Sequence, residues 1–243
     1  MRVLIVLPTY QEATNIVTVL QRIRAAVPTA EVLVVDDNSP DGTADLAEAT
    51  AREIGGVDVL RRPGKAGLGS AYRAGFAHGL AAGADVLVEM DADLQHDPAA
   101  LPSLLRPALA GEADLVIGSR YVPGGSIPDW PFHRRALSRW GNRYAAAMLG
   151  LDVADTTAGF RAYRAEMVRK LELETVSTDG YGFQIDMTYR VTRAGGRIIE
   201  VPIAFTERVR GKSKMSGRII VEALVAVTWW GIRDRVRGRR RTA

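Results

Sequence analysis

The chain has 243 residues, 47% of them hydrophobic, and a formal net charge of +4. This length can bury one substantial core and suggests a single domain. Cysteine does not occur in the sequence, which excludes disulfides, thiolate zinc sites and cysteine nucleophiles.

Short apolar runs alternate with helical patterns along the first half of the chain. The runs predict strands at residues 3–7, 31–35, 57–60, 86–90 and 115–118. Apolar residues spaced three and four apart predict helices over residues 13–27, 43–54, 68–82 and 98–109. Such alternation is typical of an α/β fold, here a Rossmann-like, mostly parallel sheet with helices on both faces. The first run is too short and too weakly flanked for a signal peptide, so we expect a cytoplasmic protein.

Polar, mostly acidic residues follow three of these predicted strands. The segments are Pro8–Glu12, Asp36–Gly42 and Asp91–Gln95. In open α/β sheets, ligands bind beyond the carboxyl ends of the strands, so these residues are the first candidates for a site. Neither a G-x-G-x-x-G motif after the first strand nor a P-loop motif is present, which argues against dinucleotide and P-loop chemistry.

Asp91, Asp93 and Gln95 are candidate metal ligands. If the chain stays extended after the fourth strand, the three side chains point the same way. Oxygen ligands of this kind suit Mg²⁺ or Mn²⁺, which bind through one or two carboxylates together with substrate phosphates. An isolated D-x-D is more often a solvated acidic loop, but its position at the end of a strand favours the metal site.

Three further residues suggest a nucleotide pocket. Asp37 and Glu12 follow the second and first strands, where a carboxylate can accept hydrogen bonds from ribose hydroxyls or a base edge. The composition of Asp36–Gly42 is also that of an ordinary turn. Lys65 lies in a glycine-rich loop that opens a helix, a position that favours phosphate, although a plain flexible loop explains it as well.

Beyond residue 120 the alternation gives way to loop-rich sequence around residues 123–131. We predict helices over residues 133–149 and 183–193 and a strand over residues 197–204, and we expect this half to build the acceptor side of the site. The segment 208–214 carries four cations in seven residues. It is either solvated surface or a mobile loop that closes over phosphate.

The C-terminal region joins an apolar run to a basic tail. Residues 219–232 are strongly apolar and contain Trp229 and Trp230, whereas residues 233–243 hold six arginines and one aspartate. The run is shorter than the roughly 20 apolar residues that span a bilayer. It suits a helix lying on an anionic membrane surface, or equally a helix packed on the core. The tail alone also suits nucleic acid or a solvated end.

Together these segments resemble family-two glycosyltransferases of the GT-A fold, and among them the dolichol-phosphate or polyprenol-phosphate mannose synthases. The motifs are LPTYQE, VVDDNSPDGT, GLGSAYRAGF, MDADLQHDP, GSRY, AGFRAYR, GYGFQIDM and VPIAFTERVRGKSK. The first four mark the wider family and the last three the lipid-phosphate branch; Gln11 stands where that family usually has Asn. The likeness extends from residue 3 to about residue 222. It implies a GT-A domain over residues 1–218, followed by a helix and tail over residues 219–243.

The resemblance implies a metal-dependent enzyme that transfers mannose from GDP-mannose to a polyprenyl phosphate. Asp91, Asp93 and Gln95 are implied as metal ligands, with the two aspartates and Arg120 in catalysis. Arg120 and Arg134 are implied at the acceptor phosphate. With Lys65 added from its glycine loop, the expected nucleotide-sugar pocket consists of Pro8, Tyr10, Glu12, Val35, Asp37, Lys65, Ala92, Arg208 and Lys214.

A phosphate acceptor also predicts the course of the reaction. The second pKa of a phosphate monoester is near 6, so the nucleophile is already ionised and needs no general base. A single displacement then inverts the anomeric carbon. Because the lipid tail stays in the bilayer, we expect a peripheral protein on the inner face of the membrane, with or without a separate membrane anchor protein.

Three alternatives stay open at this stage. The enzyme uses a UDP-sugar or a different acceptor, for example as a polyprenyl-phosphate glucosyltransferase; the chain is a nucleic-acid-binding module that uses its arginine tail; or it is a non-catalytic scaffold. Nucleic acid is not an expected partner, since the strand-end acids repel a phosphate backbone.

Overall fold

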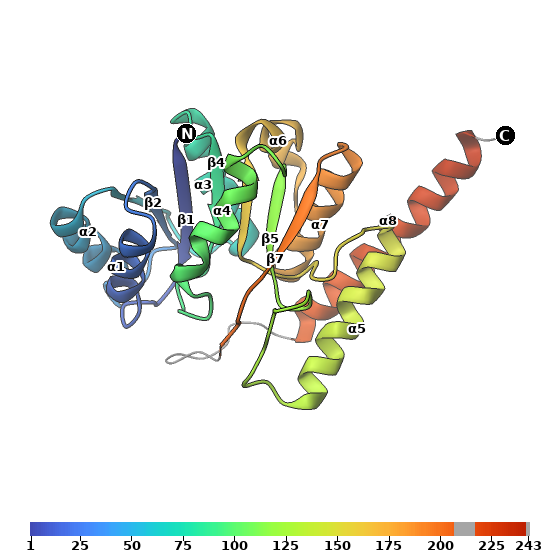
Figure 1. Ribbon diagram of the computed structural model, residues 1–243, viewed down its shortest axis with the longest axis horizontal. Helices are drawn as coiled ribbons and strands as arrows, with labels where there is room; N and C mark the ends of the chain where they lie inside the picture. The colour runs from blue at the N-terminus through green and yellow to red at the C-terminus, as the bar shows by residue number, and fades with distance from the viewer. Residues whose placement is uncertain (207–216, 242–243) are drawn as a thin grey trace.

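The computed structural model describes residues 1–206 and 217–241, and its centre is a seven-stranded sheet (Figure 1). The strands are β1 (Val3–Thr9), β2 (Glu31–Asp36), β3 (Val57–Arg61), β4 (Val86–Glu89), β5 (Leu115–Ser119), β6 (Arg161–Arg164) and β7 (Ile198–Pro202). They lie in the order β3-β2-β1-β4-β6-β5-β7. Neighbouring strands are parallel except where β6 pairs antiparallel with β4 and β5. The predicted mostly parallel sheet is confirmed.

Helices cover both faces of this sheet. They are α1 (Ile16–Ala26), α2 (Thr43–Ile54), α3 (Leu68–Ala81), α4 (Leu101–Leu109), α5 (Phe132–Leu149), α6 (Ala165–Lys170), α7 (Gly180–Arg193) and α8 (Gly217–Arg241), with short 3₁₀ turns at Pro98–Ala100 and Leu173–Thr175. Helices α1, α2 and α4 share one core with the sheet, and α3, α6 and α7 share the other.

The burial of β1 explains its unbroken apolar sequence. Val3, Ile5 and Leu7 enter the core beneath α1, α2 and α4, whereas Leu4 and Val6 enter the core beneath α3 and α7. Both faces of the strand are therefore dry. Helix α3 lies so close that a side chain at Gly75 would come within 2.3 Å of Val6.

Helices α5 and α8 pack against each other at one side of the sheet (Figure 1). Ala145 of α5, Ile185 of α7, and Ala223 and Val227 of α8 form a small apolar cluster between the three helices. None of the helices in the described part of the chain is both long enough and apolar enough to cross a membrane.

Most element boundaries lie within a few residues of the predicted ones. Helix α1 begins three residues later and α7 three residues earlier than predicted, and α8 begins two residues before the predicted apolar run and ends nine residues after it. Strand β6 and helix α6 were not predicted. The reason is visible in β6, where the arginine that starts the strand is fully buried yet reads as polar in a sequence pattern.

Candidate active site

A cavity opens beyond the carboxyl ends of β4 and β5, close to where the strand order reverses between β1 and β4. Crevices at such reversals are the usual ligand sites of α/β sheets. Both halves of the chain contribute to its wall. The lining residues are Leu68, Asp91, Gln95, His96, Arg120, Trp130, Arg134, Thr157, Gly159, Gly180, Tyr181, Gln184 and Phe205.

The segment carrying Asp91 and Asp93 is a turn, so the expectation of an extended chain over residues 91–95 is wrong. Strand β4 ends at Glu89, and Leu94 adopts a positive φ of 63°. The Asp93 carboxylate accepts a hydrogen bond from the backbone N–H of Gln95 (3.1 Å), a local contact that favours the turn. Asp91 and Gln95 line the cavity, whereas Asp93 is buried beside it.

The residues of this turn fit a hard divalent cation. Asp91 is half-buried at the cavity wall and accepts a hydrogen bond from the Tyr72 hydroxyl (3.2 Å). Gln95 donates its side-chain N–H to the Thr206 carbonyl (3.1 Å), so its amide is already oriented. Among the described residues no three His, Cys, Asp or Glu side chains form a metal cluster. Mg²⁺ and Mn²⁺ do not require one, because one or two carboxylates and substrate phosphates suffice.

Arg120 is held in place by a buried ion pair with Asp155. Its Nε donates to Asp155 Oδ2 (2.7 Å) and its Nη2 donates to Oδ1 (2.6 Å) and to the Thr157 hydroxyl (2.8 Å). Burial alone raises the pKa of the Asp155 carboxyl, but the Arg120 guanidinium outweighs burial and lowers that pKa below its usual value. Two of the three guanidinium nitrogens are thus committed, and the group reaches the cavity as a fixed positive charge.

Arg134 also lines this cavity, close to Arg120. Its guanidinium stacks 3.8 Å from the ring centroid of Trp130, a buried residue whose ring also lies 5.8 Å from Arg120. Tyr181 of α7 lines the same cavity. The structure therefore brings Arg120 and Arg134 together at one wall, as the sequence analysis expected of cations for a phosphate.

A second, mainly apolar cavity continues from this wall between α5 and α8. It shares Trp130, Arg134, Thr157 and Tyr181 with the first cavity. Its remaining lining is largely aliphatic and aromatic, and comprises Leu137, Ser138, Trp140, Gly141, Asn142, Ala145, Ile185, Ile220, Ala223, Leu224 and Val227. A charged cavity thus leads directly into an apolar one.

On the donor side, Asp37 already has a protein partner. Its Oδ1 lies 2.8 Å from Nη1 of Arg62, and both side chains are largely buried. Burial raises the pKa of Asp37 despite this arginine. The preceding Asp36 shapes the turn, since it accepts hydrogen bonds from the Thr9 hydroxyl (2.8 Å) and the Ser39 backbone N–H (2.8 Å).

The other expected donor residues have different degrees of access. Lys65 places its ammonium 4.8 Å from the ring centroid of Tyr10. Pro8 and Glu12 are half-buried at the end of β1, and Glu12 accepts a hydrogen bond from the Asn15 side chain (3.0 Å). Val35 is fully buried in the core, and Ala92 is buried within the turn. These two residues could therefore contact a ligand only through their backbone atoms. Arg208 and Lys214 lie outside the described residues.

A buried polar group lies beneath the cavity. Burial raises the pKa of Glu89 to about 7, although the nearby Arg161 guanidinium lowers it. Arg161 is fully buried and donates to the carbonyls of Thr156, Ala158 and Gln184.

His96 lines the cavity itself. Burial lowers the pKa of His96 to about 4, so its imidazole is neutral at pH 7.

Sequence reasoning missed several residues of this site. Three partners of predicted site residues were missed, namely Asp155, Tyr72 and Arg62. They lie outside the three polar segments that follow the predicted strands, so the strand-end pattern did not point to them. Tyr181 and Gln184 belong to GYGFQIDM, a motif noticed without a role for its members. The helical pattern predicted most of this helix and the resemblance marked its motif, but neither gave a role to Tyr181 or Gln184.

A mostly parallel sheet flanked by helices, with an acidic turn at its carboxyl edge, is the architecture of the GT-A glycosyltransferases. The model of glycosyl transferase family 2 matches residues 4–172. The chain belongs to that family, as its motifs predicted.

Two relatives match nearly the whole chain. An undecaprenyl-phosphate mannosyltransferase from Micrococcus luteus is 54% identical, over 99% of this chain and 98% of the relative. A polyprenol monophosphomannose synthase from Mycolicibacterium smegmatis is 51% identical, over 98% of this chain and 91% of the relative.

Solved structures share the fold. A glucosyl-3-phosphoglycerate synthase from Mycobacterium tuberculosis, solved with Mn²⁺, UDP-glucose and phosphoglyceric acid, superposes with a TM-score of 0.70 at 22% identity, covering 93% of this chain and 79% of that one. A mannosyltransferase from Pyrobaculum calidifontis, in complex with GDP-Man and Mn²⁺, has a TM-score of 0.60 at 17% identity, covering 94% and 69%.

Proposed function

We propose that this protein transfers mannose from GDP-mannose to a polyprenyl phosphate at a membrane surface. The observation that carries the proposal is the continuity of the two cavities. The acidic turn lies at one end, Arg120 and Arg134 lie in the middle, and an apolar groove between α5 and α8 forms the other end. This sequence of chemistries matches a metal-bound donor, an acceptor phosphate and a lipid tail. The names of the two relatives support the same assignment.

The donor end is supported by the chemistry of the turn. Asp91 and Gln95 face the cavity with oxygen-bearing groups, and Asp93 lies directly behind them. When bound there, Mg²⁺ or Mn²⁺ would neutralise charge on the departing diphosphate. Lys65, Tyr10 and Glu12 lie on the β1 side, where a nucleotide would extend away from the transferred sugar. The Mn²⁺ and nucleotide sugars bound by two proteins of the same fold are consistent with this arrangement.

The acceptor end is supported by the two arginines. Arg120 is rigid because Asp155 and Thr157 hold two of its nitrogens, and Arg134 is braced on Trp130. A rigid cation binds phosphate at a lower cost in conformational entropy than a mobile one. The phosphate of a polyprenyl phosphate seated between them would aim an oxygen toward Asp91, and its tail would follow the apolar groove.

We expect the reaction to proceed without a general base. The acceptor phosphate is largely ionised at neutral pH, because its second pKa is near 6. His96 is the histidine that lines the cavity, and burial lowers its pKa to about 4, which makes it a weak base. Direct attack of phosphate oxygen on the anomeric carbon forms the new C–O bond as the bond to GDP breaks, so the configuration inverts.

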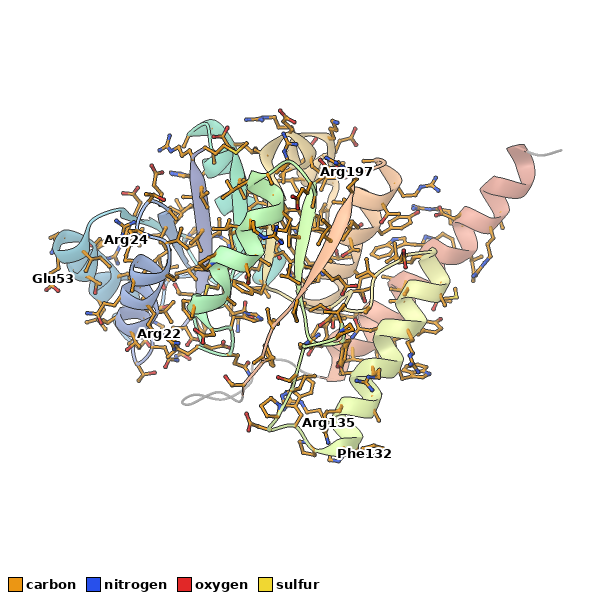
Figure 2. The ribbon with its side chains drawn as sticks, in the orientation of Figure 1. Arg22, Arg24, Glu53, Phe132, Arg135 and Arg197 are labelled. Carbon is orange, nitrogen blue, oxygen red and sulfur yellow. The ribbon has the colours of Figure 1, made fainter. Side chains whose placement is uncertain are left out.

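Membrane contact is supported by an exposed apolar stripe on α8, which consists of Val221, Val225, Trp229, Ile232 and Val236. These residues recur every three or four positions, so they share one face of the helix. On α5, Phe132 and Trp140 are also exposed, and the same helix carries the exposed Arg135, Arg139 and Arg143. Figure 2 shows Phe132 and Arg135 at the outer end of α5. Apolar side chains beside cations favour an anionic membrane surface.

The sequence suited α8 either as a helix lying on a membrane surface or as a helix packed on the core, and its two faces allow both. The inner face packs on α5 and α7 through Ala223 and Val227, and the outer face carries the stripe. We propose that the protein is peripheral, on the cytoplasmic face of the membrane.

A competition assay tests the proposal. The protein is incubated with Mn²⁺, a short polyprenyl phosphate, and equal amounts of GDP-mannose and UDP-glucose carrying different isotopes. We expect lipid-linked mannose and no lipid-linked glucose. Transfer of glucose would instead establish the UDP-sugar alternative, and absence of any transfer from either donor would contradict the proposal. Replacing the acceptor with the corresponding polyprenol, which lacks the phosphate, should abolish the reaction.

A further inference from the structure

Asp179 contacts Gly69, a residue of α3 that lies 110 residues earlier in the chain. Asp179 immediately precedes α7, but its side chain does not cap that helix. Its Oδ1 instead accepts a hydrogen bond from the backbone N–H of Gly69 (2.9 Å), in the first turn of α3. The glycine-rich start of this helix favours an anion such as phosphate, and the structure places a protein carboxylate there.

The contact depends on two glycines. Gly67 has a φ of +92°, and a Cβ built on it would lie 2.1 Å from Asp179 Oδ2. A Cβ on Gly69 would lie 2.6 Å from the backbone oxygen of Thr178. A side chain at position 67 must therefore displace the carboxylate. Gly64, in the same loop, has nothing within 4 Å of its Cβ position.

This contact holds residues 62–68, a loop that forms part of the wall on the proposed donor side of the cavity. Arg62 pairs with Asp37, and the backbone N–H of Ala66 lies 3.4 Å from the same carboxylate. Lys65 rests against Tyr10, and Leu68 lines the charged cavity. We call residues 62–68 the glycine loop.

The other partner of the contact, α7, forms part of the wall on the proposed acceptor side of the cavity. Tyr181 and Gln184 line the charged cavity, and the Phe183 ring stacks on Tyr72 of α3 with centroids 5.9 Å apart. Tyr72 in turn donates to Asp91. Any change in how α3 sits on α7 therefore reaches the expected metal ligand.

We propose that Asp179 is a positioning residue that locks the glycine loop and the start of α3 to α7. Through this lock, the donor wall and the acceptor wall keep a fixed separation across the cavity. In this proposal Asp179 has no contact with substrate and acts through Lys65, Leu68 and Tyr72. Its effect on donor binding rests on the proposed function, but its effect on the loop does not.

Trypsin tests the lock without any substrate, because the Lys65–Ala66 bond lies within the glycine loop. Cleavage of that bond in the folded protein is followed by mass spectrometry. We expect Asp179→Ala and Gly67→Ala to accelerate it about tenfold, the order of a lost hydrogen bond to a charged group. Asp179→Asn keeps the accepting oxygen and should restore protection, and Gly64→Ala should behave as the parent protein does.

Two results would overturn the lock. One is an Asp179→Ala protein cleaved at Lys65 no faster than the parent. The other, which decides the matter if Asp179→Ala fails to fold, is equal cleavage of Gly67→Ala and Gly64→Ala.

Calorimetric binding of GDP with Mn²⁺ tests the consequence for the donor. Asp179→Ala should weaken GDP binding about tenfold while Asp179→Asn stays near the parent value. Unchanged GDP binding in a variant with an opened loop would overturn the donor role alone. A parent protein that does not bind GDP would contradict the proposed function, whereas the trypsin result would still decide the lock.

Discussion

Asp91 and Asp93 are two residues apart in sequence but lie in different surroundings. Asp91 is half-buried at the cavity wall, with Tyr72 donating to it. Asp93 is buried and accepts a hydrogen bond from the backbone of Gln95. The first aspartate is therefore placed for a ligand, and the second also shapes the turn that presents the first.

This difference predicts separable effects of substitution. Asp91→Asn should lower kcat at least about 100-fold and weaken Mn²⁺ binding, with little change in Tm, because a half-exposed carboxylate contributes little to folding. Asp93→Ala should lower both activity and Tm. Steady-state kinetics and thermal unfolding distinguish the two, and full activity of Asp91→Asn would remove the metal ligand from the account.

The Arg120–Asp155 ion pair is expected to stabilise the fold. Asp155→Asn leaves a buried guanidinium without its charge partner and should cost about 3–5 kcal/mol of unfolding free energy at pH 7. The exposed Asp152, in the same loop, serves as control, and Asp152→Asn should cost little.

The pH dependence of this pair has a definite sign. Because the pKa of Asp155 is lowered in the folded state, its stabilising effect is complete above the ordinary carboxyl pKa of about 3.9 and is lost as the pH falls through the folded pKa. Urea unfolding of the parent and the Asp155→Asn protein should therefore converge as the pH falls below about 4. A constant difference down to pH 2 would contradict the assignment.

At the level of elements, the two adjacent tryptophans of α8 lie on different faces of the helix. Trp229 is 63% exposed on the apolar stripe, whereas Trp230 is half-buried and stacks on Tyr189 with centroids 6.0 Å apart. One tryptophan thus serves the surface and the other the packing of α8 on α7.

Substituting each tryptophan in turn tests membrane contact. Trp229→Ser should weaken binding to vesicles containing anionic phospholipid by about tenfold without lowering Tm, since an exposed indole contributes to the interface alone. Trp230→Ser should lower Tm. Sedimentation with vesicles measures the first effect, and equal vesicle binding of Trp229→Ser and the parent would argue against the stripe as a contact surface.

The elements differ in how far the sequence determines them. Strands β1, β2 and β4 could be predicted because both of their faces are buried, which makes each strand an unbroken apolar run. Strand β6 could not, because Arg161 satisfies its charge with backbone carbonyls that come together only in the fold. The turn after β4 was misjudged because Leu94 takes a left-handed conformation that its residue type does not announce.

The same distinction applies to the candidate site. Strand-end acids could be found because the topology of parallel sheets brings them to one edge. The partners that hold the site, such as Asp155 for Arg120 and Asp179 for Gly69, lie 35 and 110 residues away from the residues they bind. Contacts of that range follow from the packing of α5 and α7 on the sheet, and no local pattern carries them.

For the whole molecule, the proposed function assigns the donor to the edge of the sheet and the lipid to the α5–α8 pair, and it places the reaction at the boundary between them. Arg120 marks that boundary, since it follows β5 and is bound by the loop after α5. On the proposed function, a phosphate at this point would be reached by a lipid from one side and by a nucleotide sugar from the other.

The configuration of the product tests this account most directly. GDP-mannose labelled with ¹³C at the anomeric carbon is incubated with a short polyprenyl phosphate and Mn²⁺, and the purified lipid product is analysed by NMR. Direct attack by the acceptor phosphate predicts a single β-linked mannosyl phosphate, inverted from the α-linked donor, with one GDP released per mannose transferred. An α-linked product, or release of free mannose without lipid-linked sugar, would contradict it.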